Sequence, residues 1–126
     1  MVELSDGSAR MRLPYSADLV GNPDTGVLHG GAITSLMDAC CGAAVFMKLI
    51  MPVPIATLDL RIDYLRPADP GRDVLAHATC FRLTRNVAFV RGIAYVDDEA
   101  DPVAAAAGAF MLATSLGPAA TPRSQP

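Results

Sequence analysis

Apolar residues recur every three or four positions after Gly30, and this segment constrains the fold more than any other feature of the sequence. These spacings are typical of one helical face, and Pro52 and Pro54 cannot continue a helix. The pattern therefore predicts one helix of about 20 residues, ~30 Å long. Its apolar positions are Ile33, Leu36, Met37, Cys40, Cys41, Ala44 and Val45.

The same segment is long enough to suggest a membrane span, but its composition disfavours one. Thr34, Ser35 and Asp38 interrupt it, and glycine and alanine are frequent in it. A carboxylate at the centre of a lone span is also costly. We therefore expect a helix inside a protein and no membrane partner.

After Pro54 the pattern changes to the alternation of β-strands. Apolar and charged residues alternate between positions 57 and 65, which predicts a half-buried strand with Leu58, Leu60, Ile62 and Tyr64 on one face. Further strands are expected at 74–83 and 87–96, and a short edge strand within 10–22. Segment 103–116 is ambiguous, because four alanines favour a helix and later residues favour a strand; following a meander, we interpret it as a strand.

These elements predict an α+β fold in which an antiparallel sheet wraps around one helix that is apolar nearly all round. The 126 residues suffice for a single domain. We expect a flexible N-terminus at 1–8, the folded domain at 9–116 and a disordered tail at 117–126. Hydrophobic residues make up 52% of the chain, more than a monomer needs, which favours buried subunit contacts.

Charge and cysteine content exclude other classes of protein. The net charge is -3 and the ten basic residues are scattered, so we expect no nucleic-acid partner. Cys40, Cys41 and Cys80 are odd in number and form no CxxC pair, which favours reduced thiols over disulfides or a metal site. The first residues lack the apolar segment of a signal peptide, and we expect a cytoplasmic location.

Two glycines open the predicted helix. The N–H groups of Gly30 and Gly31 are unobstructed by side chains, and the helix dipole adds partial positive charge. Such a helix start can hold an anion or a developing oxyanion. The alternative is that the glycines only let a neighbouring element approach closely.

Asp38 lies among apolar residues in the middle of the helix. A buried carboxylate is costly unless it is paired or hydrogen-bonded, and such acids are frequent at functional sites. The alternative is a structural carboxylate that pairs with an arginine such as Arg61 or Arg91.

The spacing between Gly30 and Asp38 constrains what they can do together. Their separation of eight residues corresponds to ~12 Å along a helix axis and ~80° around it. A base or nucleophile and an oxyanion donor must both lie within roughly 3 Å of one reacting group. If both are catalytic, the site combines Gly30 of one subunit with Asp38 of another, and a two-fold dimer forms two such sites.

The pattern N…G-x-L-H-G-G-A-x-x-x-L-x-D, from Asn22 to Asp38, followed by TLDLRIDYLRPADPG, resembles the hotdog-fold acyl-CoA thioesterases. The most similar branch contains the phenylacetyl-CoA and hydroxybenzoyl-CoA thioesterases with a mid-helix carboxylate. The resemblance implies a homodimer formed sheet to sheet, often paired into a homotetramer, with active sites between subunits. It also implies a hydrolase for an aryl- or medium-chain acyl-CoA substrate that uses no metal or organic cofactor.

The resemblance further implies the roles of single residues. The Gly30 N–H polarises the thioester carbonyl, and Asp38 of the partner subunit is the general base or the nucleophile. His29 helps to hold the substrate carbonyl or the Gly30 loop.

Asn22 falls near a family position that orients water, and Thr57 aligns with a residue that contacts the lytic water. Simple alternation puts Thr57 on the same strand face as Asp59 and Arg61, so this role requires an irregular strand start.

Expected substrate and CoA contacts are Gly31, Met37, Cys41, Arg66, Arg82, Arg85, Asn86 and Arg91. Met37 and Cys41, together with Met47, would line the acyl pocket. The arginines would meet the CoA phosphates, with 82–86 best placed; the alternative is that they are solvated charges on a strand face. We interpret His77 and the cysteines as structural.

Two other functions remain open from the sequence. A hotdog hydratase or dehydratase would need His29 and Asp38 at one site to act on the acyl chain. A noncatalytic acyl-CoA-binding or scaffold protein would bind its ligand without Asp38.

Overall fold

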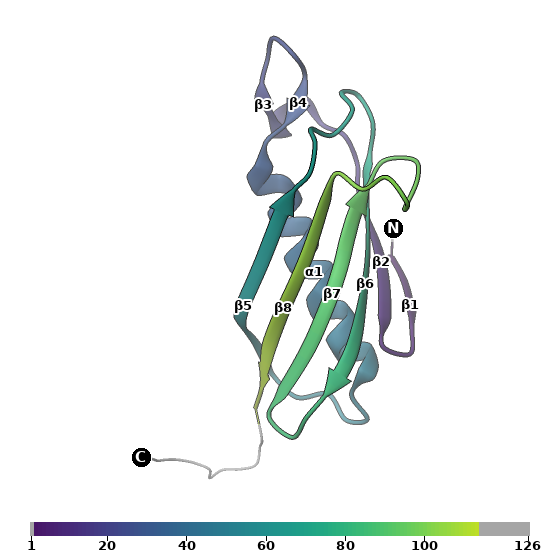
Figure 1. Cartoon of the computed structure of the whole chain (residues 1–126), viewed down its shortest axis with the longest axis vertical. Coiled ribbons are helices and arrows are strands. Elements are labelled where there is room, and N and C mark those ends of the chain that lie inside the picture. The colour runs from purple at the N-terminus through teal and green to yellow at the C-terminus, as the bar shows by residue number, and fades with distance from the viewer. Residues whose placement is uncertain (1, 114–126) are drawn as a thin grey trace.

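The computed structural model describes residues 2–113, in which a long helix lies against an antiparallel sheet (Figure 1). The elements in chain order are β1 (Val2–Ser5), β2 (Ser8–Leu13), the 3₁₀-helix η1 (Ala17–Leu19), β3 (Val20–Asn22), β4 (Val27–Leu28), α1 (Gly30–Lys48), β5 (Ile55–Tyr64), β6 (Val74–Leu83), β7 (Val87–Tyr95) and β8 (Ala104–Leu112). The strand interpretation of the alanine-rich segment is thus confirmed by β8. The expected tail at 117–126 lies outside the described residues.

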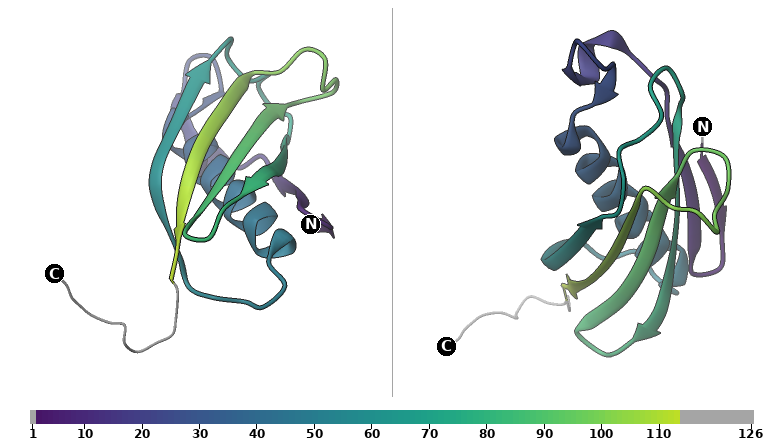
Figure 2. Two further views of the ribbon diagram at one scale, coloured as in Figure 1. Left: turned by 60° about the horizontal axis from the view of Figure 1, so that its bottom comes forward. Right: turned by 45° about the horizontal axis from the view of Figure 1, so that its top comes forward.

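Six strands form one antiparallel sheet in the order β1–β2–β6–β7–β8–β5. α1 lies across one face of this sheet, and β3 and β4 form a separate ribbon beyond the start of the helix (Figure 1, Figure 2). β5 is an edge strand, so one of its sides has no strand neighbour within residues 2–113. The predicted α+β arrangement of one long helix and an antiparallel sheet is confirmed.

The core lies between α1 and the inner face of the sheet. All seven helix positions expected from the apolar spacing are buried: Ile33, Leu36, Met37, Cys40, Cys41, Ala44 and Val45. They pack with inward-facing strand residues, among which Val74 and Val90 are 0% exposed. Full burial of a side chain such as valine or methionine contributes about 1.5–3 kcal/mol. This contact layer therefore fixes which face of α1 points toward the sheet.

The sheet wraps one side of α1, and the expectation that this helix is apolar nearly all round is wrong. By length and composition α1 could cross a membrane, but its apolar face packs against the sheet. The opposite face stays exposed and consists mainly of small and polar residues: Gly31, Thr34, Ser35, Asp38, Ala39 and Phe46. This open face leaves room for a second subunit along the helix.

The N-terminal segment is also more ordered than the sequence predicted. Residues 2–5 pair with residues 8–11 in a hairpin that continues the sheet through β2. Gly7 closes the turn at φ 68°, a conformation that favours glycine. The Gly7 N–H also donates to the Met47 carbonyl at 3.1 Å. These contacts to distant residues explain why a locally polar segment forms a strand.

A β-bulge interrupts β5 at Leu58. Thr57 pairs with Phe110 of β8, whereas Asp59 pairs with the next residue back, Ala109, so Leu58 is an extra residue without a partner. The extra residue reverses the side-chain alternation of β5, so Thr57 points to the same inward face of the sheet as Phe110. Gly108 lies beside the bulge, where a Cβ atom would come within 2.6 Å of the Asp59 carbonyl oxygen. Glycine at 108 is therefore required for the bulged strand to pair with β8.

We expect Gly108→Ala to lower the free energy of unfolding by about 1–3 kcal/mol, because β5 or β8 must move to relieve the overlap. Chemical denaturation followed by circular dichroism measures this change. Gly42→Ala is the matched control, since a Cβ there meets no atom closer than 3.7 Å. Alanine in a helix should preserve stability or raise it by up to about 1 kcal/mol. Equal stability of the two variants would contradict the steric requirement at Gly108.

Candidate active site

The first turn of α1 leaves one backbone donor open. His29 is the N-cap residue, and its Nδ1 accepts from the Gly31 N–H at 2.9 Å. The Ala32 N–H donates to the His29 carbonyl at 3.0 Å. The Gly30 N–H has no hydrogen-bond partner among residues 2–113. His29 thus holds the helix start, which is one of its two expected roles, and Gly30 keeps a donor at the positive end of the helix dipole.

Tyr64, at the end of β5, fixes the same helix start and was not identified from the sequence. Its hydroxyl donates to the Gly30 carbonyl at 2.8 Å and is also hydrogen-bonded to the Thr34 hydroxyl. From the sequence, the position of Tyr64 on the apolar face of the alternating strand indicated only that its ring would be packed. A Cβ at Gly30 would lie 3.7 Å from the Tyr64 ring, an ordinary contact. Close approach therefore does not explain the glycine at position 30.

Gly31 has a different reason to be glycine. A Cβ at Gly31 would lie 3.1 Å from the Nδ1 atom of His29, which is tight for the capping geometry. The two alternative explanations for the glycine pair therefore apply to different residues. Gly31 allows the histidine cap, and Gly30 carries the open donor.

A mainly apolar cleft of about 340 Å³ lies at this end of the molecule. It is lined by Val27, Leu28, Gly30, Ile33, Tyr64, Leu65, Arg66, Pro67 and Ala68. The Arg66 guanidinium is held by Asp69 at 3.1 Å and by Asp101 at 3.5 Å. Its buried Nε atom has no hydrogen-bond partner among the described residues. Of the predicted CoA contacts, Arg66 is thus next to the open Gly30 donor.

Asp38 lies on the open face of α1, so the expectation that it is buried within its own chain is wrong. The neighbouring Met37 is 1% exposed, because it points to the sheet, whereas Asp38 is exposed. The alternative of an arginine partner also fails. Arg61 pairs with Asp63 at 3.3 Å, and the Arg91 guanidinium lies 4.4 Å from the centre of the Phe81 ring.

Thr57 is the hydrogen-bond partner of Asp38. Its hydroxyl donates to the Asp38 Oδ1 atom at 3.1 Å. This contact exists because the bulge at Leu58 turns Thr57 toward the helix. The irregular strand start that the predicted role of Thr57 required is therefore present. One carboxylate oxygen is oriented by this bond, and the group remains open to the outside of the chain.

Other predicted site residues are not brought to these groups within one chain. The Asn22 side chain accepts from the Asp24 N–H at 3.0 Å in the turn between β3 and β4, so its role with water stays a prediction. Met37 and Cys41 are core residues and do not line the cleft. Arg82, Arg85 and Asn86 belong to the β6–β7 hairpin at the end of the sheet opposite the helix start (Figure 1).

The three cysteines are buried free thiols. Burial raises the pKa of Cys40 to about 11 and that of Cys41 to about 12, and it also raises the pKa of Cys80. The thiolate is the nucleophilic form of cysteine. Their interpretation as structural residues therefore agrees with their surroundings, whereas Asp38 is an exposed carboxylate on α1.

A long helix on an antiparallel sheet, with polar groups along the open helix face, defines the hotdog class of proteins. Residues 25–103 match the family model described as the thioesterase superfamily, and the chain belongs to this family.

Individual relatives agree with this assignment. A solved Pseudomonas aeruginosa protein is 51% identical, with a TM-score of 0.79 over 87% of this chain and 82% of that chain. The phenylacetic acid degradation protein PaaI of Thermus thermophilus, solved as an asparagine-to-aspartate mutant, is 28% identical, with a TM-score of 0.76 over 89% and 91% of the two chains. A Halobacterium salinarum protein provisionally named as an esterase is 38% identical over 112 residues, which cover 84% of this chain and 73% of that protein.

Thr57→Val removes the hydrogen bond to Asp38 while it preserves the shape of the side chain at position 57. We therefore expect it to slow any reaction in which the Asp38 carboxylate takes part. Loss of a hydrogen bond to a charged group corresponds to about 1.5–3 kcal/mol, so kcat for thioester hydrolysis should fall roughly 10- to 100-fold with little change in KM. Thiol-release kinetics measure both constants. A threonine elsewhere on the sheet, Thr79, gives the control Thr79→Val. Unchanged kcat in Thr57→Val would remove this residue from the site.

The native thiols should resist alkylation at pH 8, because each thiol is buried and its pKa is raised. Before unfolding, iodoacetamide should label fewer than about one thiol per chain, as counted by mass spectrometry. In denaturant it should label all three. Rapid native labelling of Cys41, accompanied by loss of hydrolysis, would instead make a cysteine the nucleophile.

Proposed function

We propose that this protein is an acyl-CoA thioesterase whose active sites each combine two subunits. The observation that carries the proposal is a pair of groups on α1, the Gly30 N–H without a partner among residues 2–113 and the exposed Asp38 carboxylate that Thr57 orients. These groups are the two that thioester hydrolysis needs, an oxyanion donor and a base or nucleophile. Their separation along one helix requires a second copy to bring them together.

The edge strand β5 suggests how that second copy binds. Its two ends carry the two halves of the site, since Tyr64 contacts Gly30 at one end and Thr57 contacts Asp38 at the other. An antiparallel pairing of β5 with the same strand of a partner, about a two-fold axis, puts the Tyr64 end of one chain beside the Thr57 end of the other. Each helix start then faces a partner carboxylate, and the sheet continues across the dimer.

The chemistry at such a site needs few groups. The thioester carbonyl oxygen accepts a hydrogen bond from the Gly30 N–H, and charge that develops on this oxygen is stabilised by the helix dipole. Asp38 of the partner either takes a proton from water as the water attacks the carbonyl or attacks the carbonyl itself. Collapse of the tetrahedral intermediate breaks the C–S bond. When Asp38 acts as the base, the leaving sulfur takes the proton that Asp38 accepted from water; when Asp38 is the nucleophile, water hydrolyses the acyl-aspartate anhydride, supplies the proton to the CoA thiolate and restores the carboxylate. Thr57 orients Asp38, and His29 holds the amide in position.

The cleft beside Gly30 supports the proposed substrate class. Its apolar lining suits an acyl group, and Arg66 at its edge supplies a cation for an anionic part of CoA. Aryl and medium-chain aliphatic groups both fit this description. The similar Thermus protein is named for phenylacetic acid degradation, so phenylacetyl-CoA is the first substrate to test. The three free thiols favour the cytoplasm.

We expect thiol release from at least one of a panel of aryl, short-, medium- and long-chain acyl-CoA substrates. Asp38→Asn keeps the size of the side chain and should lower kcat/KM by about 10²- to 10⁴-fold, the usual contribution of a general base. Binding of a non-hydrolysable acyl-CoA analogue should change little. No turnover of any substrate by the parent protein, with intact analogue binding, would favour a noncatalytic acyl-CoA-binding protein instead. Acyl-chain hydration without thiol release would favour the hydratase.

Mixed subunits test whether the site is shared. Gly30→Pro removes the N–H at the first helical position, where proline is tolerated, and His29 at φ -62°, ψ 136° already has a backbone suited to precede proline. Gly30→Pro and Asp38→Ala homodimers should both be inactive, whereas each heterodimer should regain about half of the parent activity from its one intact site. Gly30→Ala keeps the N–H and is the active control. Inactive heterodimers, once isolated, would contradict the shared site.

A further inference from the structure

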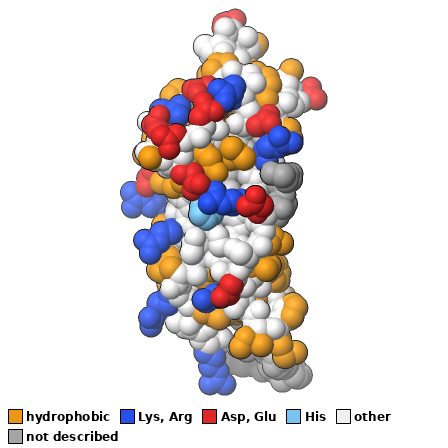
Figure 3. Space-filling model, turned by 90° about the vertical axis from the view of Figure 1, so that its right-hand side faces the viewer, with side chains coloured by type: hydrophobic (Ala, Val, Ile, Leu, Met, Phe, Trp, Pro, Cys, Tyr) orange, Lys and Arg blue, Asp and Glu red, His pale blue; other side chains and the backbone are white. Residues whose placement is uncertain are grey.

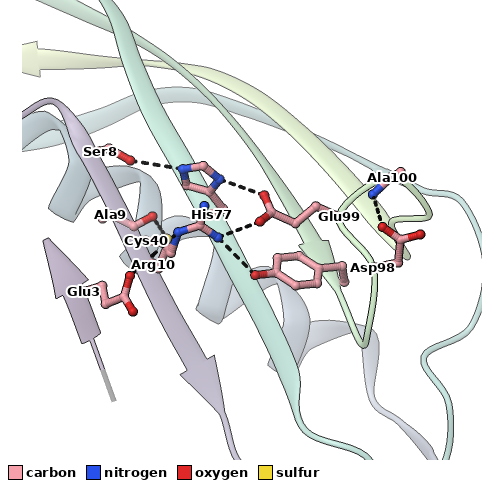
Figure 4. A network of polar contacts seen from close by, with 10 residues as sticks. Glu3, Ser8, Ala9, Arg10, Cys40, His77, Asp98, Glu99 and Ala100 are labelled. Atoms are coloured by element: carbon pink, nitrogen blue, oxygen red, sulfur yellow. Dashed lines mark hydrogen bonds and ion pairs between the residues drawn. The ribbon is translucent and has the colours of Figure 1, made fainter. Parts of the chain in front are cut away.

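A second cluster of polar side chains lies on the outer face of the sheet, away from α1, and the proposed thioester chemistry does not use it. Ser8 of β2, His77 of β6 and Glu99 between β7 and β8 form its line of contacts, which Figure 4 shows together with Arg10. Figure 3 views the side of the molecule next to β1 and β2, where a histidine lies at the surface among acidic and basic side chains. The cluster joins three segments that are distant in sequence.

The contacts have the order of a nucleophile, a base and an orienting carboxylate. The Ser8 Oγ atom lies 3.1 Å from His77 Nε2, and His77 Nδ1 lies 2.9 Å from Glu99 Oε1. The other Glu99 oxygen accepts from Arg10 Nη1 at 2.7 Å. Each side chain in the line is therefore positioned by the next one, as required of an activated hydroxyl.

The charge on Glu99 determines the direction of these hydrogen bonds. Its hydrogen bonds from Arg10 and then His77 hold the pKa of this carboxyl below its usual value. An ionised carboxylate can only accept, so a neutral His77 ring carries its proton on Nδ1. The lone pair on Nε2 then points to Ser8, whose hydroxyl is the donor. A ring in this tautomer can take the hydroxyl proton when Ser8 attacks.

An open cavity of about 350 Å³ gives access to Ser8. Glu3, Leu4, Ser5, Ser8 and Arg10 line it, so the serine and a guanidinium face the same space. Arg10 has five N–H groups, and it can donate to an oxyanion while it remains bound to Glu99. The backbone here offers no comparable donor, since Ser8 pairs with both neighbouring strands and the Gly7 N–H donates to Met47. Lack of one such donor slows catalysis by about 10²- to 10³-fold, so turnover should be slow.

We propose that Ser8 is a second nucleophile, activated by His77 and Glu99, that is acylated by small uncharged esters. Oγ attacks the ester carbonyl carbon as its proton moves to His77 Nε2. The ester C–O bond breaks, and the leaving oxygen takes that proton. Water then gives a proton to Nε2 and attacks the acyl-serine, which releases the carboxylic acid and restores the Ser8 hydroxyl.

Acetylation by 4-nitrophenyl acetate in an Asp38→Asn background tests this proposal, because the thioesterase site is then disabled. We expect one acetyl group on the Ser8 peptide by mass spectrometry, with matching release of nitrophenolate. His77→Gln should slow acetylation by about 10²-fold or more, and Glu99→Gln should also slow it.

Thr79→Val is the matched control, since Thr79 lies opposite Ser8 on β6, is exposed and takes no part in the hydrogen bonds that join Ser8, His77 and Glu99. Its acetylation rate should stay within about twofold of the background protein, because His77 and Glu99 are unchanged. Ser8→Ala removes a single oxygen atom, and a fluorophosphonate probe should no longer label the hairpin peptide of this variant.

Absence of acetyl-Ser8 in the Asp38→Asn protein would overturn the proposal. Equal acetylation rates in His77→Gln and Thr79→Val, with both variants folded, would also overturn it and leave the cluster as a structural connection. Neither outcome depends on thioester hydrolysis, so these experiments test the Ser8 proposal independently of the proposed thioesterase function.

Discussion

The packing of the apolar face of α1 against the sheet is the contact on which the rest of the structure depends. It buries the positions spaced by three and four residues, including Cys40 and Val45, and thereby turns the opposite face outward. Asp38 and the start of the helix are exposed because their neighbours are buried. The hydrophobic contacts therefore determine the direction of the polar groups, although no polar group takes part in them. An uncovered helix face beside an edge strand, β5, that has no partner on one side within residues 2–113 is also the main structural reason to propose a dimer.

The bulge at Leu58 is the second feature that shapes the proposed site. One extra residue reverses the side-chain alternation of β5, and Thr57 reaches Asp38 only on the reversed side. Gly108 permits this irregularity, since any side chain there would overlap the Asp59 carbonyl. A glycine on β8 thus supports a hydrogen bond on α1 without contact to either partner. The family match ends at residue 103, so it covers α1 and β5 but not β8 or Gly108, and it does not by itself assign roles to any of them.

Much of the fold could be predicted from the sequence, because helical and strand periods are local properties. The helix from Gly30 and the strands between Pro54 and residue 96 follow from these periods, whereas the strand at 104–112 was inferred from its place after a meander. Residues 2–5 were missed, since their strand depends on pairing with a distant neighbour, β6, through β2. Met37 and Cys41 were expected in a substrate pocket, but periodicity cannot distinguish a core side chain from a pocket side chain. The role of Tyr64 was missed because side-chain alternation predicts the face of the strand on which a residue lies and not the hydrogen bonds that it makes.

The sequence by itself determined the long helix, its glycine start, and the eight-residue distance that separates Gly30 from Asp38 within a chain. Those conclusions need only the fixed rise and period of an α-helix. Only the tertiary structure decided that Gly30 has an open N–H, that Thr57 rather than an arginine contacts Asp38, and that Ser8, His77 and Glu99 meet on the outer face. Each of these depends on strand register and on contacts between distant segments. A shift of one residue in register would turn Thr57 or His77 to the other face of the sheet.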